Sequence, residues 1–272
     1  MMQSWVNGAP GDLLSVRDRG LAYGDGLFET LAVRGGRIRL LSRHLARLAE
    51  GCRRLSLPLD LALVEAELTA FAAQTGEGVV KLLVTRGEGQ RGYTLPDPCQ
   101  PLRILQAGPL PQYPAAHAEQ GVCLFPCATR LSEQPLLAGL KHLNRLEQVL
   151  ARAEWQGGEY AEGLMRDAHG RVIEGIFSNL FLVRDGALLT AELSRCGVAG
   201  VMRAEILERA HGLGWPVAIR DIAYDELLAA DEVFLCNSLY GIWPVRTLQA
   251  RHWPVGQLTR KLQGILDDLM SN

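Results

Sequence analysis

Hydrophobic and polar residues alternate along the first hundred residues in a pattern typical of strands, with two longer helical stretches between them. Alternation predicts the following strands: 2–8, 27–33, 38–41, 78–85 and 102–107. Apolar residues from Leu45 to Cys52 recur at helical spacing, which predicts a helix over 43–55 with Ser42 as its N-cap. A second helix is predicted over about 61–75. This part of the chain therefore reads as a β-rich α+β unit.

The second half continues the mixture of strands and helices. The predicted strands are 121–129, one ending at 165, a hairpin around 170–174, then 179–184, 188–190, 217–219 and 232–236. The predicted helices are 145–157, 201–212, 224–229 and 256–270.

A proline-rich stretch at 108–114 separates the two halves. Its prolines can continue neither a helix nor a central strand. We therefore predict an N-terminal domain over 1–107, an interdomain linker over 108–118 and a C-terminal domain over 119–272.

Composition narrows the classes of function. The 272 residues are 48% hydrophobic and 21% charged, with a net charge of −2, which provides no broad basic surface for nucleic acid or anionic membrane. No run approaches the roughly 18 apolar residues that would span a bilayer, and the N-terminus lacks a secretory pattern. These features predict a cytoplasmic protein.

The six cysteines show no Cys-x-x-Cys spacing and are expected to be buried thiols in a reducing compartment. Cys123 and Cys127 would face the same side of a predicted strand, but without a nearby pair of histidines they make a poor metal site. No metal is expected.

Lysine is scarce: Lys81, Lys141 and Lys261 are the three lysines among 28 basic residues. Lysine can form a Schiff base and can lose its proton when desolvated, whereas arginine can do neither. Lys81 falls in a predicted core strand and Lys261 in the last helix. Lys141 precedes an amphipathic helix, so it is the candidate covalent catalyst, with an ordinary charged residue near a helix start as the alternative.

Two further motifs carry possible chemistry. The turn Gly197-Val198-Ala199-Gly200 leads into the helix that begins at Val201, and the N–H groups of such a helix start suit a phosphate, although the glycines could serve the turn alone. Glu174 follows a predicted hairpin strand and could pair with a pyridine nitrogen, or it could be a solvated carboxylate.

Several segments together resemble the fold-type IV pyridoxal phosphate enzymes, the class-IV aminotransferase family. These segments span nearly the whole chain and are Asp18-Arg19-Gly20 to Thr30, His44-x-x-Arg47-Leu48, Lys141, Glu174-Gly175, Ser178-Asn179-Leu180-Phe181 and Gly200-Val201-Met202-Arg203. The resemblance implies an α+β, two-domain fold like that of D-amino acid aminotransferase. Its smaller N-terminal α/β domain would precede a larger C-terminal α/β domain with a β-barrel-like sheet core.

The resemblance also implies the cofactor and the residues that hold it. Lys141 would carry pyridoxal 5'-phosphate as an internal aldimine, and Glu174 would pair with the ring nitrogen. The remaining cofactor-binding residues would be Arg47, Val201, Met202, Ser238 and Asn179. From the residues alone, Arg47 could instead be a surface helix arginine, and Asn237-Ser238 could be a simple cap of a strand end.

Within this class, the runs 139–150 and 86–93 resemble the aminodeoxychorismate lyases. The resemblance implies a lyase that converts 4-amino-4-deoxychorismate to 4-aminobenzoate and pyruvate for folate biosynthesis. Lys141 would remove the proton from the amine-bearing carbon. Thr30 would relay a proton to the departing enolpyruvate, unless it is an ordinary β-branched strand residue. Arg91 would bind a substrate carboxylate, unless it is solvated.

Two other functions stay open from the sequence. Glu29, which precedes Thr30, also occurs at this position in aminotransferase relatives, so a D-amino acid or branched-chain aminotransferase is the alternative enzyme. A pyridoxal phosphate carrier without catalysis is the non-enzymatic alternative, although the presence of Lys141 and Glu174 argues against it. The resemblance further implies a homodimer.

Overall fold

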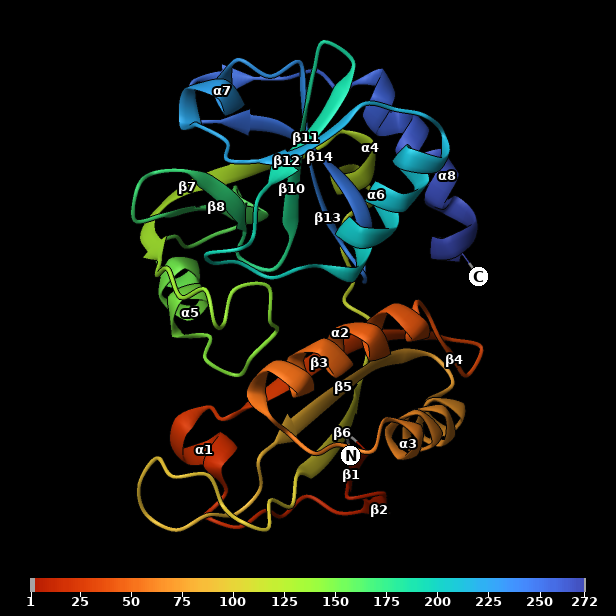
Figure 1. Cartoon of the computed structure of the whole chain (residues 1–272). Helices are drawn as coiled ribbons and strands as arrows, with labels where there is room; N and C mark the ends of the chain where they lie inside the picture. The colour runs from red at the N-terminus through yellow and green to blue at the C-terminus, as the bar shows by residue number, and fades with distance from the viewer. Residues whose placement is uncertain (1–2, 272) are drawn as a thin grey trace. The chain divides into compact units, whose positions relative to one another are not determined.

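The computed structural model describes residues 3–271 (Figure 1). Residues 1–2 and 272, which include the first residue of the predicted strand 2–8, lie outside the described part. The chain forms two compact units. Unit 1 contains the described residues up to Pro111 together with Leu140–Asn144, and unit 2 contains Gln112–Gly139 and Arg145–Ser271.

Unit 1 is a six-stranded sheet in the order β2-β1-β6-β5-β3-β4, with every pair antiparallel. Its strands are β1 (Ser4–Val6), β2 (Ala9–Pro10), β3 (Gly26–Arg34), β4 (Arg37–Ile38), β5 (Gly78–Thr85) and β6 (Leu102–Gly108). Its helices are α1 (Arg19–Tyr23), α2 (Leu41–Leu55) and α3 (Leu61–Thr75).

The helices of unit 1 begin and end where local hydrogen bonds permit. Asp60 caps α3 through its side chain, which accepts from the N–H of Leu63, and Gly76 ends the helix with a positive φ. Helix α2 starts two residues earlier than predicted. Its N-cap is Leu40 in the left-handed conformation, and Ser42 lies inside the helix, so the predicted Ser42 cap is wrong.

Strand alternation gives the sheet of unit 1 two different faces. Leu31, Val80 and Leu82 belong to a buried cluster with residues of α2 and α3, such as Leu48 and Phe71. The opposite face carries half-buried and exposed side chains, which include Phe28, Thr30, Lys81 and Gln106. Lys81 lies in the predicted strand, which pairs with β3 and β6 on its two sides, and its side chain is exposed on this face.

Unit 2 is built on a nine-stranded sheet that closes on itself. The ring runs β7-β8-β9-β10-β13-β14 and returns to β7, so it forms a six-stranded barrel, as the predicted barrel-like core requires. These strands are β7 (Val122–Leu131), β8 (Glu162–Asp167), β9 (Val172–Gly175), β10 (Asn179–Arg184), β13 (Glu232–Asn237) and β14 (Gly241–Leu248).

The remaining elements of unit 2 extend or cover this barrel. The additional strands are β11 (Ala187–Ala191), β12 (Val217–Arg220) and β15 (Arg251–His252). The helices are α4 (Ala115–Glu119), α5 (Leu146–Ala153), α6 (Val201–Gly212), α7 (Tyr224–Leu228) and α8 (Gln257–Ser271). Helix α4 begins inside the stretch that the sequence predicts as a linker, 108–118.

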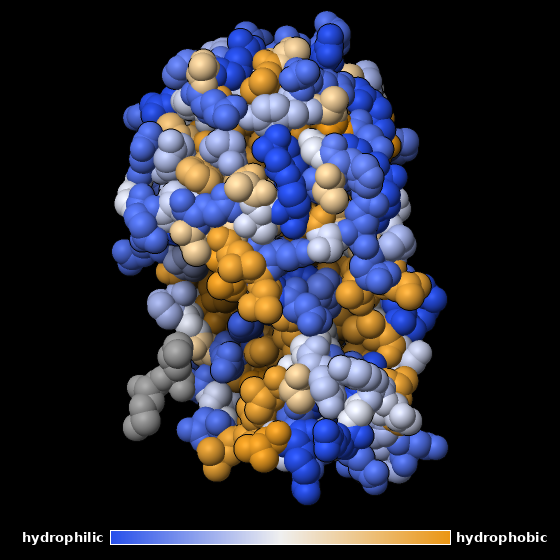
Figure 2. Space-filling model, turned by 90° about the vertical axis from the view of Figure 1, so that its left-hand side faces the viewer, coloured by the Kyte–Doolittle hydropathy of each residue, from blue (hydrophilic) through white to orange (hydrophobic). Residues whose placement is uncertain are grey.

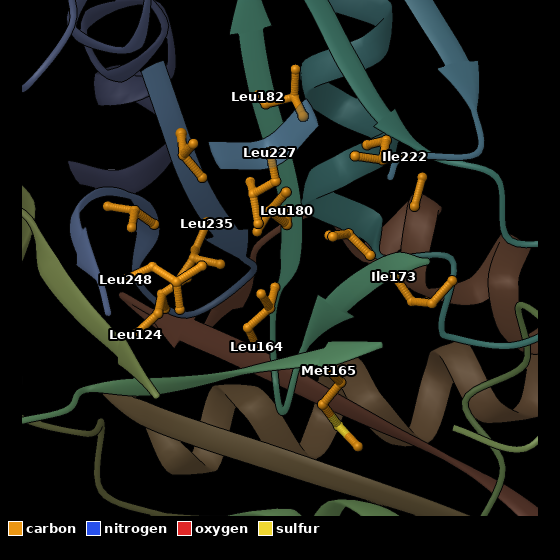
Figure 3. Close-up of a cluster of buried hydrophobic side chains, with 14 of the residues drawn as sticks. Leu124, Leu164, Met165, Ile173, Leu180, Leu182, Ile222, Leu227, Leu235 and Leu248 are labelled. Carbon is orange, nitrogen blue, oxygen red and sulfur yellow. The ribbon is translucent and has the colours of Figure 1, made fainter. Parts of the chain in front are cut away.

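Leucine-rich side chains fill the core of unit 2. Figure 3 shows Leu164, Leu180 and Leu235 gathered between the strands of the barrel. Leu227 of α7 and Ile222 close the same cluster, and both are fully buried. This apolar interior fixes the strands that carry the polar residues described below.

Two strands of the barrel differ from the sequence-based expectation. Strand β14 is missing from the prediction because Pro244 lies in its middle, and proline is unusual in a central strand. In β7, a shift in register between Pro126 and Arg130 changes the alternation. Cys127 is buried in the core while Cys123 is only half-buried, so the expectation that both cysteines face one side is wrong.

Within residues 3–271, no helix is both long enough and apolar enough to cross a lipid bilayer.

Candidate functional site

The backbone around Lys141 is fixed to the edge of the sheet in unit 1. The N–H of Phe28 donates to the carbonyl of Lys141 at 2.9 Å, and the N–H of Leu143 donates to the carbonyl of Gly26 at 3.0 Å. Leu27 and His142 form an antiparallel bridge between these bonds. Residues 140–144 therefore act as a short additional strand beside β3, and this pairing sets the direction of the Lys141 side chain.

The Lys141 amine lies over an aromatic ring. Its Nζ is 4.4 Å from the centroid of the Phe28 ring, and the Nζ of Lys81 is 5.5 Å from the same centroid. Thr30 is directly opposite Lys81 in the β3–β5 pairing and two residues beyond Phe28. Alternation therefore puts Phe28, Thr30 and Lys81 on the same face of the sheet.

Glu29 points to the other face, where it pairs with helix α2. His44 Nδ1 lies 2.6 Å from Glu29 Oε2, and Arg47 Nε donates to Glu29 Oε1 at 2.8 Å. Burial on its own would raise the pKa of Glu29, but the Arg47 charge and the His44 hydrogen bond outweigh it and lower the pKa to about 2. Burial lowers the pKa of His44, and the Lys141 charge acts in the same direction.

Because of this ion pair, the acid at position 29 does not distinguish a lyase from an aminotransferase. The Glu29 side chain is locked among α2 residues on the face opposite Thr30. Its contacts explain an acid at this position by the need to hold Arg47, whichever reaction the protein catalyses. Arg47 has 13% of its side chain exposed, so it is not the solvated surface arginine that the sequence left open.

Arg91 lies in the loop that follows β5, at residues 86–101. Its side chain is exposed and lines a surface hollow of about 1050 Å³ within unit 1, together with Arg19 and Tyr23. Arg19 is buried and holds this loop through the carbonyl of Gly92 at 3.0 Å and a salt bridge to Asp25 at 3.0 Å. The base of the loop is therefore fixed, whereas Arg91 itself is accessible.

Glu174 of unit 2 is buried at the closure of the barrel. It is paired with Asn179 in the register of β9 and β10, which is the contact that closes the ring of strands. Its Oε2 accepts from the N–H of Val198 at 2.9 Å and from the Asn179 amide at 3.3 Å. The same amide donates to the Val198 carbonyl at 2.8 Å, so Asn179 fixes both the carboxylate and the glycine-bearing turn.

The turn at 197–200 leads into α6 as expected. Gly200 is the N-cap and provides no side-chain hydrogen bond to the first turn of the helix, which includes Val201 and Met202. A Cβ on Gly200 would lie 1.9 Å from Asn179 Oδ1, so only glycine fits here. Arg203 points back to the barrel, where its Nη2 donates to the Ala191 carbonyl at 2.9 Å.

Ser238 lies in the turn between β13 and β14. Asn237 organises this turn, because its Oδ1 accepts from the N–H groups of Leu239 at 2.9 Å and Tyr240 at 3.0 Å. Asn237 is thus a structural cap, as the sequence allowed. Helix α6 packs against β13, which places Ser238 just after a strand that contacts the helix.

Two charged residues near these groups were missed from the sequence. Arg145, immediately before α5, interacts electrostatically with Glu174; burial lowers its pKa, and the carboxylate acts in the opposite direction. Glu162 is fully buried in β8 and accepts from Ser178 Oγ at 2.7 Å and from the N–H of Ile176 at 3.0 Å. Burial outweighs these hydrogen bonds and raises its pKa to about 7.

The role of Glu162 follows from its contacts. Its hydrogen bonds hold the turn 175–178, which joins the strand of Glu174 to the strand of Asn179. The only sequence signal for this residue is an acid within an otherwise apolar predicted strand. For Arg145 the signal is its place within the run 139–150 that contains Lys141.

Comparison with known proteins identifies the family. The profile described as amino-transferase class IV matches residues 26–248, which is most of the chain. The chain belongs to the class IV aminotransferase family. The fold expected from the sequence is confirmed by a crystal structure of 4-amino-4-deoxychorismate lyase from Pseudomonas aeruginosa. It is 68% identical, has a TM-score of 0.96, and the match covers 97% of this chain and 98% of that one.

Other members of the class IV family show the same relationship. An aminodeoxychorismate lyase from Vibrio harveyi is 38% identical over 269 residues, which cover 97% of this chain and 99% of that protein. The pyridoxal phosphate-bound form of a hypothetical aminotransferase from Mycobacterium tuberculosis is 25% identical, with a TM-score of 0.82 and 99% of each chain covered. At least one solved relative of this chain therefore binds pyridoxal phosphate.

The predicted residues fall into two groups in this class IV protein. Lys141 and Thr30 lie near Phe28 in unit 1, while Arg47 and Arg91 lie elsewhere in the same unit. In unit 2, Asn179 contacts Glu174 directly and Gly200 at the start of α6. Each of the remaining predicted residues of unit 2 lies at a helix start or just after a strand end: Val201, Met202 and Ser238.

Proposed function

We propose that this protein is an aminodeoxychorismate lyase that converts 4-amino-4-deoxychorismate to 4-aminobenzoate and pyruvate. The observation that carries the proposal is the 68% identity, over 97% of the chain, to a solved structure described as a 4-amino-4-deoxychorismate lyase. The 38% identity to the Vibrio harveyi lyase over almost the full chain supports it. Folate biosynthesis is the pathway that uses 4-aminobenzoate, so we place the reaction there.

We propose that pyridoxal 5'-phosphate is the cofactor, and the groups of this chain fit it. Glu174 is a buried carboxylate whose Oε2 is fixed by two donors, which suits a partner for a protonated pyridine nitrogen. The first turn of α6 has no side-chain cap, which suits a phosphate at its N–H groups. Lys141 supplies the amine. When bound, the cofactor would accept the electron pair released as the substrate loses its proton.

The residues of the chain would then have separate roles in holding the cofactor and in moving the proton. Lys141 would hold the cofactor covalently and, once released by the substrate amine, would take the proton from the amine-bearing ring carbon. Glu174 would keep a proton on the pyridine nitrogen. Val201, Met202 and Ser238 would bind the phosphate. Arg47 would join them, and its ion pair with Glu29 would fix the guanidinium for this contact.

Thr30 would complete the elimination. Its hydroxyl, on the same sheet face as Phe28, would relay the proton taken up by Lys141 to the oxygen of the departing enolpyruvate, which then becomes pyruvate. The ring that remains is aromatic, and this aromaticity drives the step. Arg91 would bind a substrate carboxylate, and its exposed position in the loop after β5 is compatible with that role.

We also propose a homodimer in the cytoplasm. Three large apolar residues lie on one side of α5 at helical spacing: Leu146, Val149 and Leu150 are 75%, 60% and 60% exposed. Hydrophobic surface is visible among hydrophilic side chains in Figure 2. Such a stripe favours association. All six cysteines are free thiols, which suits a reducing compartment. Sedimentation should give twice the 29.8 kDa chain mass.

The decisive experiment supplies 4-amino-4-deoxychorismate as the sole substrate to the purified holoenzyme. We expect 4-aminobenzoate and pyruvate to form in equal amounts without a keto acid. An enzyme that forms neither product, but turns over a D-amino or branched-chain amino acid when a keto acid is present, would be an aminotransferase and would overturn the proposal. Bound cofactor without turnover of either kind would indicate a carrier.

A further inference from the structure

A second buried carboxylate contacts the hairpin that carries Glu174. Glu162 is the first residue of β8, and its side chain is fully buried. It reaches the turn 175–178, which joins β9 to β10. Glu174 and Asn179 are the residues on either side of this turn, and they are paired in the register of the two strands. A side chain that fixes the turn therefore also fixes both of these residues.

The carboxylate of Glu162 accepts four hydrogen bonds, three of them from the turn. Its Oε2 accepts from the Ser178 hydroxyl at 2.7 Å and from the N–H of Phe177 at 3.3 Å. Its Oε1 accepts from the N–H of Ile176 at 3.0 Å and from the N–H of Gly163 at 2.9 Å. An ionised carboxylate can accept all four bonds, whereas an amide has only one acceptor oxygen. These donors therefore suit a negative charge.

Gly175 keeps free the space that this carboxylate occupies. A Cβ on Gly175 would lie 2.9 Å from Glu162 Oε2 and 2.2 Å from Ser178 Oγ. The N–H of Gly175 donates to the Ser178 carbonyl at 2.8 Å, which closes the turn. A larger residue would push the turn away from the carboxylate. The contact with Glu162 thus explains the glycine and the serine of this segment, to which the proposed cofactor gives no role.

Glu162 is held by neutral donors instead of a cation. Asp167, the last residue of the same strand, pairs with Arg171 at 2.6 Å. In the part of the chain that the structure describes, Glu162 forms no ion pair with a lysine, arginine or histidine. A buried charge without such a partner lowers the stability of a fold. The charge is therefore explained better by the turn that it holds than by the stability of the barrel.

We propose that Glu162 is a positioning residue for Glu174, because it fixes the turn 175–178 and, through this turn, the proposed partner of the pyridine nitrogen. The inference rests on the proposed cofactor and on the role of Glu174 beside it. Asn179 and the N–H of Val198 hold the Glu174 carboxylate directly. Glu162 would keep Asn179 in the place from which it makes this contact.

Hydrogen exchange tests the first step, which is the contact between Glu162 and the turn. In the holoenzyme, amide exchange in peptides that span the turn 175–178 should be about tenfold faster in Glu162→Gln, because an amide cannot accept from all four donors. Ser178→Ala removes one donor and should have a smaller effect. Glu159→Gln, at an exposed turn of the same unit, should exchange like the wild type. Equal exchange in Glu162→Gln and the wild type would overturn the inference.

The dissociation constant of pyridoxal 5'-phosphate tests the second step, from the turn to Glu174. Glu162→Gln should raise this constant about tenfold, whereas Glu159→Gln should leave it unchanged. In a Glu174→Gln background, Glu162→Gln should change it less than about twofold, because the group that it positions is already lost. An equal loss in both backgrounds would overturn the inference, since Glu162 would then act independently of Glu174. A lower Tm with an unchanged dissociation constant would also overturn it.

The wild-type protein separates this inference from the lyase function. A wild type that binds the cofactor but forms no 4-aminobenzoate from 4-amino-4-deoxychorismate would contradict the lyase function alone. The comparison of dissociation constants would still decide the role of Glu162. A wild type that binds no pyridoxal 5'-phosphate would contradict the proposed cofactor and would overturn the inference with it.

Discussion

The two units hold their candidate residues by different means. In unit 1, the backbone of Lys141, Thr30 and Lys81 is placed by pairing with neighbouring strands, and their side chains project from this hydrogen-bonded backbone. In unit 2, Glu174 is held directly by its own side chain, which accepts bonds from Asn179 and from Val198.

This difference matches the tasks proposed for each unit. A group that must transfer a proton has to move between partners, and a lysine on a fixed backbone can do so. A group that must keep a charge at one point of the cofactor works best when its position does not change. Substitutions in unit 1 should therefore alter the chemical step, and substitutions in unit 2 should alter how the cofactor is held.

The largest effect is expected at Lys141. Lys141→Ala should lower kcat by at least about 1000-fold, because both the covalent attachment and the base are lost. The absorbance that borohydride removes should also disappear. Lys261→Ala and Lys81→Ala should keep this absorbance. If Lys141→Ala kept it, another amine would hold the cofactor and unit 1 would lose its central role.

The second-largest effect is expected at Glu174, the carboxylate that is held by hydrogen bonds in unit 2. Glu174→Gln should lower kcat by about 100-fold, because a neutral amide cannot stabilise the protonated pyridine. The absorbance maximum of the bound cofactor should shift, while Glu159→Gln, at an exposed turn of the same unit, should leave both unchanged. An unaltered spectrum and rate in Glu174→Gln would contradict the pairing with the ring nitrogen.

A substitution at Glu29 tests whether the face of β3 that packs against α2 contributes to the stability of the protein. Glu29→Gln should reduce the free energy of unfolding by about 3 kcal/mol at neutral pH, because Arg47 and His44 lose their buried partner. The folded pKa near 2 is below the ordinary 4.5, so this stabilisation is present above pH 4.5 and is lost as pH falls toward 2.

The measurement for Glu29 is denaturant unfolding of both proteins across this range of pH. The difference between wild type and Glu29→Gln should shrink as the solution is acidified. A difference that stays constant from pH 7 to pH 3 would show that the Glu29 carboxylate is not held by these two partners.

The smallest of these effects is expected at Thr30. Thr30→Val keeps the shape of a strand residue but removes the hydroxyl, so kcat should fall about 10-fold to 100-fold while cofactor binding is retained. Thr30→Ser should restore most of the rate. Equal activity of the valine and serine variants would mean that the proton reaches the leaving group by another route, most simply from water.

Local signals in the sequence were sufficient for elements with clear ends. Helix α3 has the predicted bounds because the Asp60 side chain caps its start and Gly76 ends it with a positive φ, which suits glycine. Strand β14 was missed because Pro244 argues against a central strand. The short helix α1 was missed because five residues contain too little periodicity, although Asp18 caps it.

Motifs predicted which residues matter, but they could not predict how those residues are held. The pairing of Glu174 with Asn179 depends on barrel closure, which joins strands through long-range contacts. The approach of Lys81 to Phe28 depends on the β3–β5 register, and register is not encoded in any single segment. Arg145 was missed because its electrostatic partner, Glu174, is 29 positions away in sequence.

The short strand that carries Lys141 also limits how this protein can be divided. The chain leaves unit 1 after Pro111, returns for Leu140–Asn144 and leaves again. A fragment ending at Pro111 would contain most of unit 1 but no reactive lysine, and its β3 would expose an unpaired edge at Leu27 and Phe28. Exposed edges promote aggregation. We therefore expect that neither unit can be expressed alone, or exchanged with that of another protein, as one contiguous segment. Both units should fold from one continuous chain.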